Sequence, residues 1–313
     1  MKLQLIKLVV NKYITTQMRK VKNYYFSTTD YIPATTLRGA ILAEYYYQKG
    51  KIEEDFYVSP AYPQNSAPSH YFSPAEGRKG SEFVEESRIL SIKNDEINKG
   101  KDMREVMNLG IDKKPRIGVI IKPNEKQKSP NETRYIKYTP SSTILMHVAI
   151  DKVSASSFHR MLYAYEYLKF NEMWALAKPG DVIDTVEQIR IGRSRSRIDS
   201  IVKVQKVKEV NLEEPDGLTY CLSPCVPSLL GEKLFEIRKL SSGKTLVIGE
   251  ESYYTGWFTT DTHSGAKPVF KTMKEGSLVY VEHKGDYSKL MPAGLNFMVK
   301  IEDLASLLSK VSL

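Results

Sequence analysis

A basic stretch at residues 190–208 combines the residue types and spacing best suited to chemistry in this chain. Alternate arginines can each fork onto phosphate oxygens, and the serines between them, Ser194 and Ser196, can donate to the same oxygens. Gly192 permits positive φ and a close approach of a ligand. The pattern favours a nucleic-acid backbone over one small phosphate, although a solvated basic turn would show it too. The stretch holds one acid, Asp199, against these basic residues: Arg190, Arg193, Arg195, Arg197, Lys203, Lys206 and Lys208.

A second candidate binding region is the aromatic cluster YYTGWF at residues 253–258. Trp257 is an aromatic residue on which unpaired bases can stack, and Lys267, later in the sequence, can supply a positive charge beside it. Packing in a hydrophobic core is the ordinary alternative for clustered aromatic residues. We predict Trp257 and Lys267 as candidate RNA contacts.

No residue is predicted to be catalytic or to bind a metal or cofactor. The histidines are scattered and lie in no recognisable nucleophile or metal motif: His70, His147, His159, His263 and His283. Cys221 and Cys225 are too few for a disulfide framework, and neither belongs to a CxxC pair. We expect them to be ordinary half-buried thiols.

Composition points to a polyanionic partner and away from the membrane. Forty-six Lys plus Arg against 37 Asp plus Glu leave a formal charge of +9 and a pI near 9.2. No stretch approaches the roughly 18 to 20 apolar residues that cross a bilayer. The N-terminus alternates polar and apolar residues and lacks a cleavage site, so it is typical of a first strand. We expect a cytoplasmic protein.

The elements that must position the basic stretch follow a familiar order. Setting aside a segment rich in proline, glycine and charge at about 51–140, the order is strand, helix, strand, strand, helix, strand. This βαββαβ pattern is typical of a ferredoxin-like (RRM-like) α+β domain, with the basic stretch beginning between the last helix and the last strand. The predicted elements are 2–14, 37–48, 143–150, 162–176, 181–190 and 201–207.

Two domains are predicted from this order. The first is a ferredoxin-like domain at 1–215 with the insertion at about 51–140. The second, at 216–313, is a smaller α+β domain, interpreted as a degenerate copy of the first fold.

Several stretches, in order along the chain, resemble the RAMP (repeat-associated mysterious protein) superfamily of CRISPR subunits. IPATTLRGAI at 32–41 resembles its first-helix motif, 147–174 its hairpin, and IRIGRSRSRIDSIVKV at 189–204 its glycine-rich loop. Residues 255–282 resemble late segments of the type III Cas-five group, which includes Csx-ten, Csm-four and Cmr-three. The chain departs from the family loop at Ile198-Asp199-Ser200, where a second glycine or a Tyr-Gly is usual.

The resemblance implies a non-catalytic RNA-binding subunit of a type III effector complex, in antiviral defence. Such a subunit holds the repeat-derived 5′ handle of the crRNA, contacts the large Cas-ten subunit and backbone Cas-seven-like subunits, and meets target RNA only indirectly. The implied RNA-binding residues are Arg38, Gly39, Gly192, Arg193, Ser194, Arg195, Ser196, Arg197, Lys203, Trp257 and Lys267.

Three alternatives stay open on the residues. A crRNA-processing endoribonuclease of the same superfamily would use His70 or His147 as an acid-base group. A backbone subunit that cleaves target RNA with metal assistance would use Asp30 or Asp151. A protein scaffold would use the basic loop to bind acidic protein partners.

Overall fold

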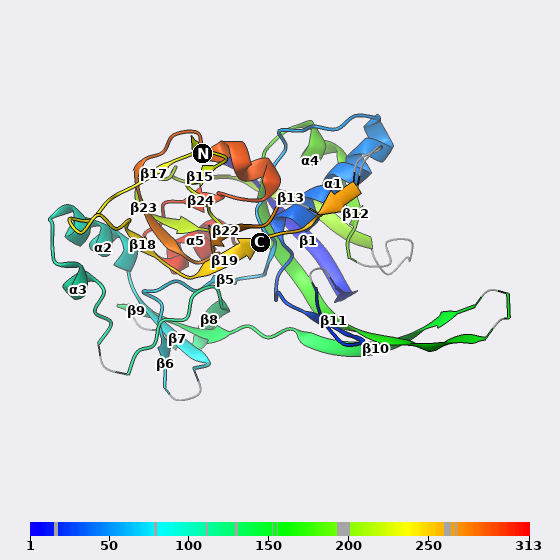
Figure 1. Cartoon of the computed structure of the whole chain (residues 1–313). Helices are drawn as coiled ribbons and strands as arrows, with labels where there is room; N and C mark the ends of the chain where they lie inside the picture. Colours follow the sequence, from blue (N-terminus) through cyan, green and yellow to red (C-terminus); the bar gives the residue numbers. More distant parts are fainter. Residues whose placement is uncertain are drawn as a thin grey trace.

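The computed structural model is a mixed α/β structure built mostly of strands in several antiparallel sheets (Figure 1). Among the residues it describes, no helix is long and apolar enough to cross a membrane. The described residues are 1–15, 18–77, 80–110, 112–128, 131–151, 153–154, 156–192, 201–259, 264–266 and 268–313.

The largest sheet is built around three long strands. β1 (Lys2–Ile14) lies between β11 (Ser157–Ala177) and β13 (Ile201–Asn211) and pairs antiparallel with both. Short strands complete its edges: β12 (Gln188–Arg190) beside β13, β3 (Tyr24–Ser27) and then β2 (Met18–Val21) along β11, and β4 (Tyr62–Pro63) also on β11.

β11 also pairs with β10 (Ser141–Ile150), and this hairpin extends well beyond the rest of the sheet (Figure 1). β10 pairs with β11 from Lys169 back to Ser157, whereas β1 pairs with β11 from Leu168 onward. The two registers overlap at Leu168 and Lys169, so β1 does not pair with the outer part of the hairpin. The predicted hairpin is therefore confirmed, with both strands longer than expected.

One face of the central sheet is covered by α1 (Ala34–Lys49) and α4 (Asp181–Thr185). The predicted helix at 37–48 is confirmed, and it ends where Gly50 adopts a left-handed φ of 69°. Its residues at helical spacing are buried as expected: Leu37, Ala40, Ile41 and Tyr45. They pack with Ile6 and Leu8 of β1 in one hydrophobic cluster.

The insertion folds against the opposite face of the same sheet. Leu3 and Leu5 of β1, with Trp174 and Leu176 of β11, share a hydrophobic cluster with it. Its small sheet runs in the order β5–β8–β9–β7–β6. Its elements are β5 (Ala67–Pro68), β6 (Ala75–Glu76), β7 (Glu82–Glu86), α2 (Ile89–Asn98), α3 (Met103–Val106), β8 (Ile120–Lys128) and β9 (Glu132–Lys137).

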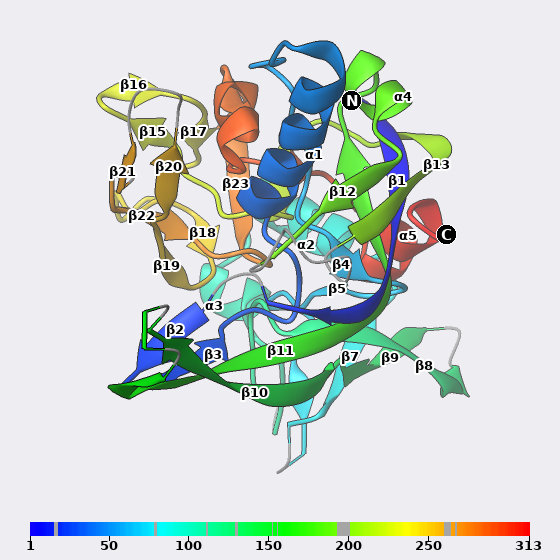
Figure 2. The same cartoon turned by 90° about the vertical axis from the view of Figure 1, so that its right-hand side faces the viewer.

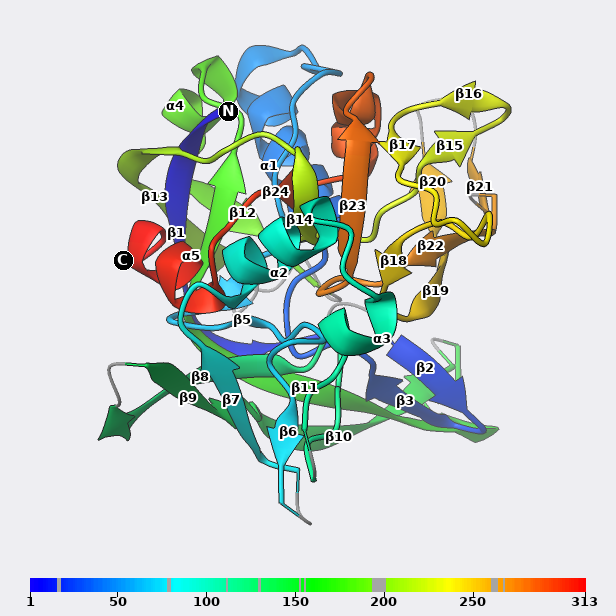
Figure 3. The ribbon, with the colours of Figure 1, turned by 90° about the vertical axis from the view of Figure 1, so that its left-hand side faces the viewer.

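The C-terminal part packs into this second cluster as well, beside α2 (Figure 3). Its main sheet runs β17–β23–β14–β24, with β18 also on β23. Its elements are β14 (Gly217–Cys221), β15 (Ser228–Leu229), β16 (Glu232–Lys233), β17 (Glu236–Ile237), β18 (Val247–Ile248), β19 (Glu251–Tyr254), β20 (Trp257–Thr259), β21 (Ser264–Ala266), β22 (Phe270–Met273), β23 (Leu278–His283), the 3-10 helix η2 (Tyr287–Ala293), β24 (Met298–Val299) and α5 (Leu304–Lys310). Residues of the insertion and of the C-terminal part share one hydrophobic cluster. The predicted domain boundary at residue 215 stays a prediction.

One predicted element is wrong in its second half. The helix expected at 181–190 ends at Thr185, Val186 is extended, and residues 188–190 form β12. β12 pairs antiparallel with β13, which places Ile189 opposite Val202 in the cluster under α1. Apolar spacing alone did not separate a helix from a short turn followed by an edge strand.

Candidate nucleic-acid interface

Gly192 is the last described residue before the arginine run, and the fold requires glycine there. Its φ is +87°, and a Cβ at this position would lie 2.7 Å from the carbonyl oxygen of Thr15. Both features exclude other side chains without local rearrangement. Gly192, which precedes the basic run in the sequence, therefore lies beside the end of β1. Arg193, Ser194, Arg195, Ser196 and Arg197 lie outside the described residues.

Lys203 is exposed on β13, where it pairs in register with Val9 and Gln188. It alternates with Val202 and Val204, which are buried in the cluster beneath α1. Because side chains alternate across a strand, Lys203 points to the face of the sheet opposite α1. The structure therefore does not bring Lys203 to the same face as Arg38.

Arg38 has a structural role within the chain. Its Nε donates to the carbonyl oxygen of Phe56 and its Nη2 to that of Glu54, both at 2.6 Å. Burial lowers the pKa of the Arg38 guanidinium, and the charges of Glu54 and Asp55 partly offset this. The side chain thus ties the segment after α1 to the helix.

Gly39 is exposed on α1, and a Cβ there would meet no atom within 4 Å. Glycine inside a helix costs about 1 kcal/mol relative to alanine. Packing within the chain therefore does not explain this glycine.

The aromatic cluster divides into a packed and an exposed part. Tyr254 stacks on Phe270 with ring centroids 4.9 Å apart, and its hydroxyl donates to the carbonyl of Ala293 at 3.0 Å. Tyr253 is 64% exposed. Trp257 begins β20, and its side chain lies outside the described part of the chain, as does the whole of Lys267.

A family model of the RAMP superfamily matches residues 22–197, more than half of the chain. This chain belongs to the RAMP superfamily. The matched part of the RAMP protein includes α1, the hairpin of β10 and β11, and the arginine run, while the region of Trp257 lies beyond it.

Solved structures similar to this RAMP protein come from CRISPR complexes. A chain of the type III-B Cmr-beta complex bound to cognate target RNA and AMPPnP is 13% identical, with a TM-score of 0.47, over 88% of this chain and 86% of that chain. The same complex bound to cognate target RNA gives 11% identity and a TM-score of 0.48 over the same shares. A chain of a type IV-B CRISPR complex is 12% identical, with a TM-score of 0.29, over 66% of this chain and 90% of that chain. No curated protein sequence matches.

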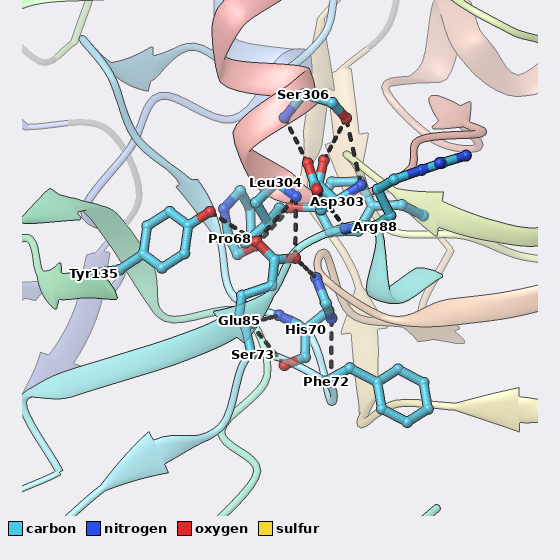
Figure 4. Close-up of polar contacts among 11 residues, drawn as sticks. Pro68, His70, Phe72, Ser73, Glu85, Arg88, Tyr135, Asp303, Leu304 and Ser306 are labelled. Atoms are coloured by element: carbon cyan, nitrogen blue, oxygen red, sulfur yellow. Dashed lines mark hydrogen bonds and ion pairs between the residues drawn. The ribbon is translucent and has the colours of Figure 1, made fainter. Parts of the chain in front are cut away.

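His70 of the RAMP protein, an alternative catalytic residue, is fully enclosed (Figure 4). The backbone N–H of Phe72 donates to Nδ1 at 3.1 Å, so Nδ1 carries no proton and Nε2 donates to Oε1 of Glu85 at 2.7 Å. Both ring nitrogens are engaged, and no ring atom faces solvent.

The other candidate catalytic groups differ in their surroundings. The ring of His147 stacks on Tyr163 with centroids 5.5 Å apart, and its Nε2 is buried without a hydrogen-bond partner among the described residues. Asp151 accepts from the backbone N–H of Val153 and the hydroxyl of Ser154, and these hydrogen bonds lower the pKa of its carboxyl. Burial raises the pKa of Asp30. The side chain of His159 and residue His263 lie outside the described part of the chain.

Cys221 and Cys225 are free thiols and are fully buried, not half-buried as predicted. Burial, followed by the neighbouring Cys221, raises the pKa of Cys225 well above its ordinary value. Within the described part of the chain, no group of three or more His, Cys, Asp or Glu is placed to hold a metal ion.

Sequence reasoning missed a basic and aromatic segment near the N-terminus. Residues 1–29 contain no Asp or Glu, and six basic residues: Lys2, Lys7, Lys12, Arg19, Lys20 and Lys22. Tyr24 and Phe26 of β3 are 45% and 38% exposed. The run without acids was the signal that could have revealed it.

Proposed function

We propose that this RAMP protein is a non-catalytic RNA-binding subunit of a cytoplasmic type III CRISPR ribonucleoprotein effector complex. It belongs to the Cas-five group and holds the repeat-derived 5′ handle of the crRNA. Membership of the RAMP superfamily supports the class, and the motif resemblance at residues 189–204 and 255–282 supports the group.

The observation that carries the proposal is the position of Gly192. A glycine with positive φ, packed against the carbonyl of Thr15 at the end of β1, directly precedes the arginine run. A solvated turn does not require a glycine packed against a backbone carbonyl at its start. Arg193, Arg195 and Arg197, with Ser194 and Ser196, grip the handle's phosphates.

The strand order supports a ferredoxin-like first domain. β13, β1, β11 and β10 succeed one another in the sheet, with α1 and α4 on one face, as in a βαββαβ unit. The C-terminal sheet is the degenerate second copy.

The non-catalytic role is supported by the surroundings of two of the alternative catalytic groups, His70 and Asp151. The imidazole of His70 is enclosed and bonded at both nitrogens, and the carboxylate of Asp151 caps its own turn. The exposed Gly39 leaves α1 open to close approach by a partner, and we assign the partners as the large Cas-ten subunit and the backbone Cas-seven-like subunits. The subunit contacts target RNA only indirectly, through these partner subunits.

The experiment is a double substitution, R193A/R195A, in the complete complex. The variant should retain less guide RNA. The slope of log affinity against log salt should fall by roughly 1.4, because each phosphate neutralised on a single strand adds about 0.7 to it. R104A/K244A removes two exposed charges elsewhere and serves as the control. Unchanged RNA content and slope in R193A/R195A would reject the assignment, and cleavage of labelled repeat RNA by the purified protein without metal would reject the non-catalytic role.

A further inference from the structure

The hairpin of β2 and β3 lies along the edge of β11, at the base of the extended β10 hairpin (Figure 2). Tyr24 pairs in register with Ala164 of β11, and Ala164 pairs on its other side with Met146 of β10. Paired residues project from the same face of a sheet, so these three share one face. Ala164 is small and buried.

Tyr24 and Phe26 present two rings of similar orientation on this face. They are two residues apart on β3, their ring planes differ by 15° and their centroids are 6.1 Å apart. Both rings are large, exposed apolar groups. Exposed rings on a sheet are the surfaces on which unpaired bases stack.

Positive charge surrounds the rings. Arg19 of β2 pairs in register with Phe26 of β3. Lys22 lies in the turn between the two strands, with a φ of 54°. Both are exposed. Glu166, the neighbouring acid on β11, already accepts the backbone N–H of Ser27 at 3.0 Å. The two exposed cations, Arg19 and Lys22, favour an anionic partner, which a purely apolar protein contact would not require.

We infer that the β2 and β3 hairpin binds single-stranded RNA by stacking two unpaired bases on Tyr24 and Phe26. Arg19 and Lys22 contact the flanking phosphates. This inference rests on the proposed function, since it supplies a second RNA contact separate from the arginine run. In this inference the hairpin binds RNA whose bases are unpaired, and residues 193–197 bind the phosphates of the handle.

The test uses the full chain and a labelled oligouridine of about ten nucleotides, within the 4 to 16 typical of such surfaces. Y24L/F26L keeps apolar area but removes the rings, and it should weaken binding by about tenfold or more without changing the salt slope. R19Q/K22N should lower the slope, with asparagine chosen because it tolerates positive φ. Y47L, at a ring that is 83% exposed on α1, is the matched control. Replacing the uridines with abasic units should remove the difference between Y24L/F26L and wild type.

The outcomes separate this inference from the proposed function. If wild type binds the oligonucleotide and R193A/R195A weakens it while Y24L/F26L does not, the hairpin inference is wrong and the function stands. If wild type does not bind the oligonucleotide, the hairpin inference is wrong, and R193A/R195A in the complete complex still decides the proposed function. The same face also exposes Met146, Val148 and Leu162. If Y24L/F26L binds RNA normally and Y24S/F26S no longer enters the complex, the face docks a protein and the inference is overturned.

Discussion

Nε2 of His70 lies 2.7 Å from Oε1 of Glu85, and neither side chain is more than 1% exposed. The carboxylate also accepts the hydroxyl of Tyr135 at 2.7 Å and the backbone N–H of Leu304 at 3.0 and 3.1 Å (Figure 4). Leu304 begins α5, whose N-cap Asp303 forms a capping box with Ser306. A buried acid of the insertion thus joins the insertion to the C-terminal helix.

Glu85→Ala should destabilise the protein by about 3 kcal/mol, because it leaves buried donors of His70 and Tyr135 without an acceptor. Urea unfolding followed by circular dichroism measures this. Glu282→Ala, which removes an exposed carboxylate 3.8 Å from Arg238, should cost less than about 1 kcal/mol. Equal effects of the two substitutions would show that the buried network contributes no more than a surface pair.

Gly192→Ala and Gly39→Ala should have opposite effects on stability. The first forces a Cβ against the carbonyl of Thr15 at positive φ and should cost about 1 to 3 kcal/mol. The second fills open space on a helix and should stabilise by up to about 1 kcal/mol. Thermal denaturation of both variants distinguishes them, and a tolerated Gly192→Ala would contradict the requirement for glycine at the start of the arginine run.

Arg38→Ala should lower stability without changing the salt dependence of RNA binding. The guanidinium donates to two carbonyl oxygens of the segment after α1, and removing charge-assisted hydrogen bonds of this kind costs about 1.5 to 3 kcal/mol. Denaturant unfolding and a salt titration of RNA binding are the two measurements. A lower salt slope with unchanged stability would instead make Arg38 a phosphate contact.

Stability should fall steeply in alkali. Burial raises the pKa of four tyrosines well above the ordinary value: Tyr31, Tyr62, Tyr135 and Tyr220. Since the folded pKa lies above the unfolded value of about 10, the stability is fully present below about pH 10 and is lost as the pH rises beyond it. Each such group adds about 1.4 kcal/mol per pH unit to the slope.

Tyr220→Phe tests the alkaline slope, because it removes one buried phenol whose hydroxyl donates to the carbonyl of Pro68 at 2.6 Å. The slope of unfolding free energy against pH above 10 should become shallower by about 1.4 kcal/mol per unit. Tyr47→Phe, at an exposed ring, should leave it unchanged. A slope that is identical in both variants would show that Tyr220 ionises in the folded protein.

Local patterns in the sequence predicted the elements that carry the arginine run. Helical spacing of Leu37, Ala40, Ile41 and Tyr45 predicted the buried face of α1, and alternation predicted β1, the hairpin and β13. The same reasoning failed at 181–190, where a short apolar pattern fits a helix as well as a turn and an edge strand.

What the sequence by itself determined is therefore the kind of local backbone, including a glycine at 192 followed by alternating arginines. Only the tertiary structure decided the partners of each side chain. His70 meets Glu85 and Tyr135, Arg38 turns inward to the carbonyl of Phe56, and Tyr24 stays exposed beside Ala164. Backbone preference depends on a few neighbouring residues, whereas burial and hydrogen bonding depend on segments brought together from as far apart as Glu85 and Leu304.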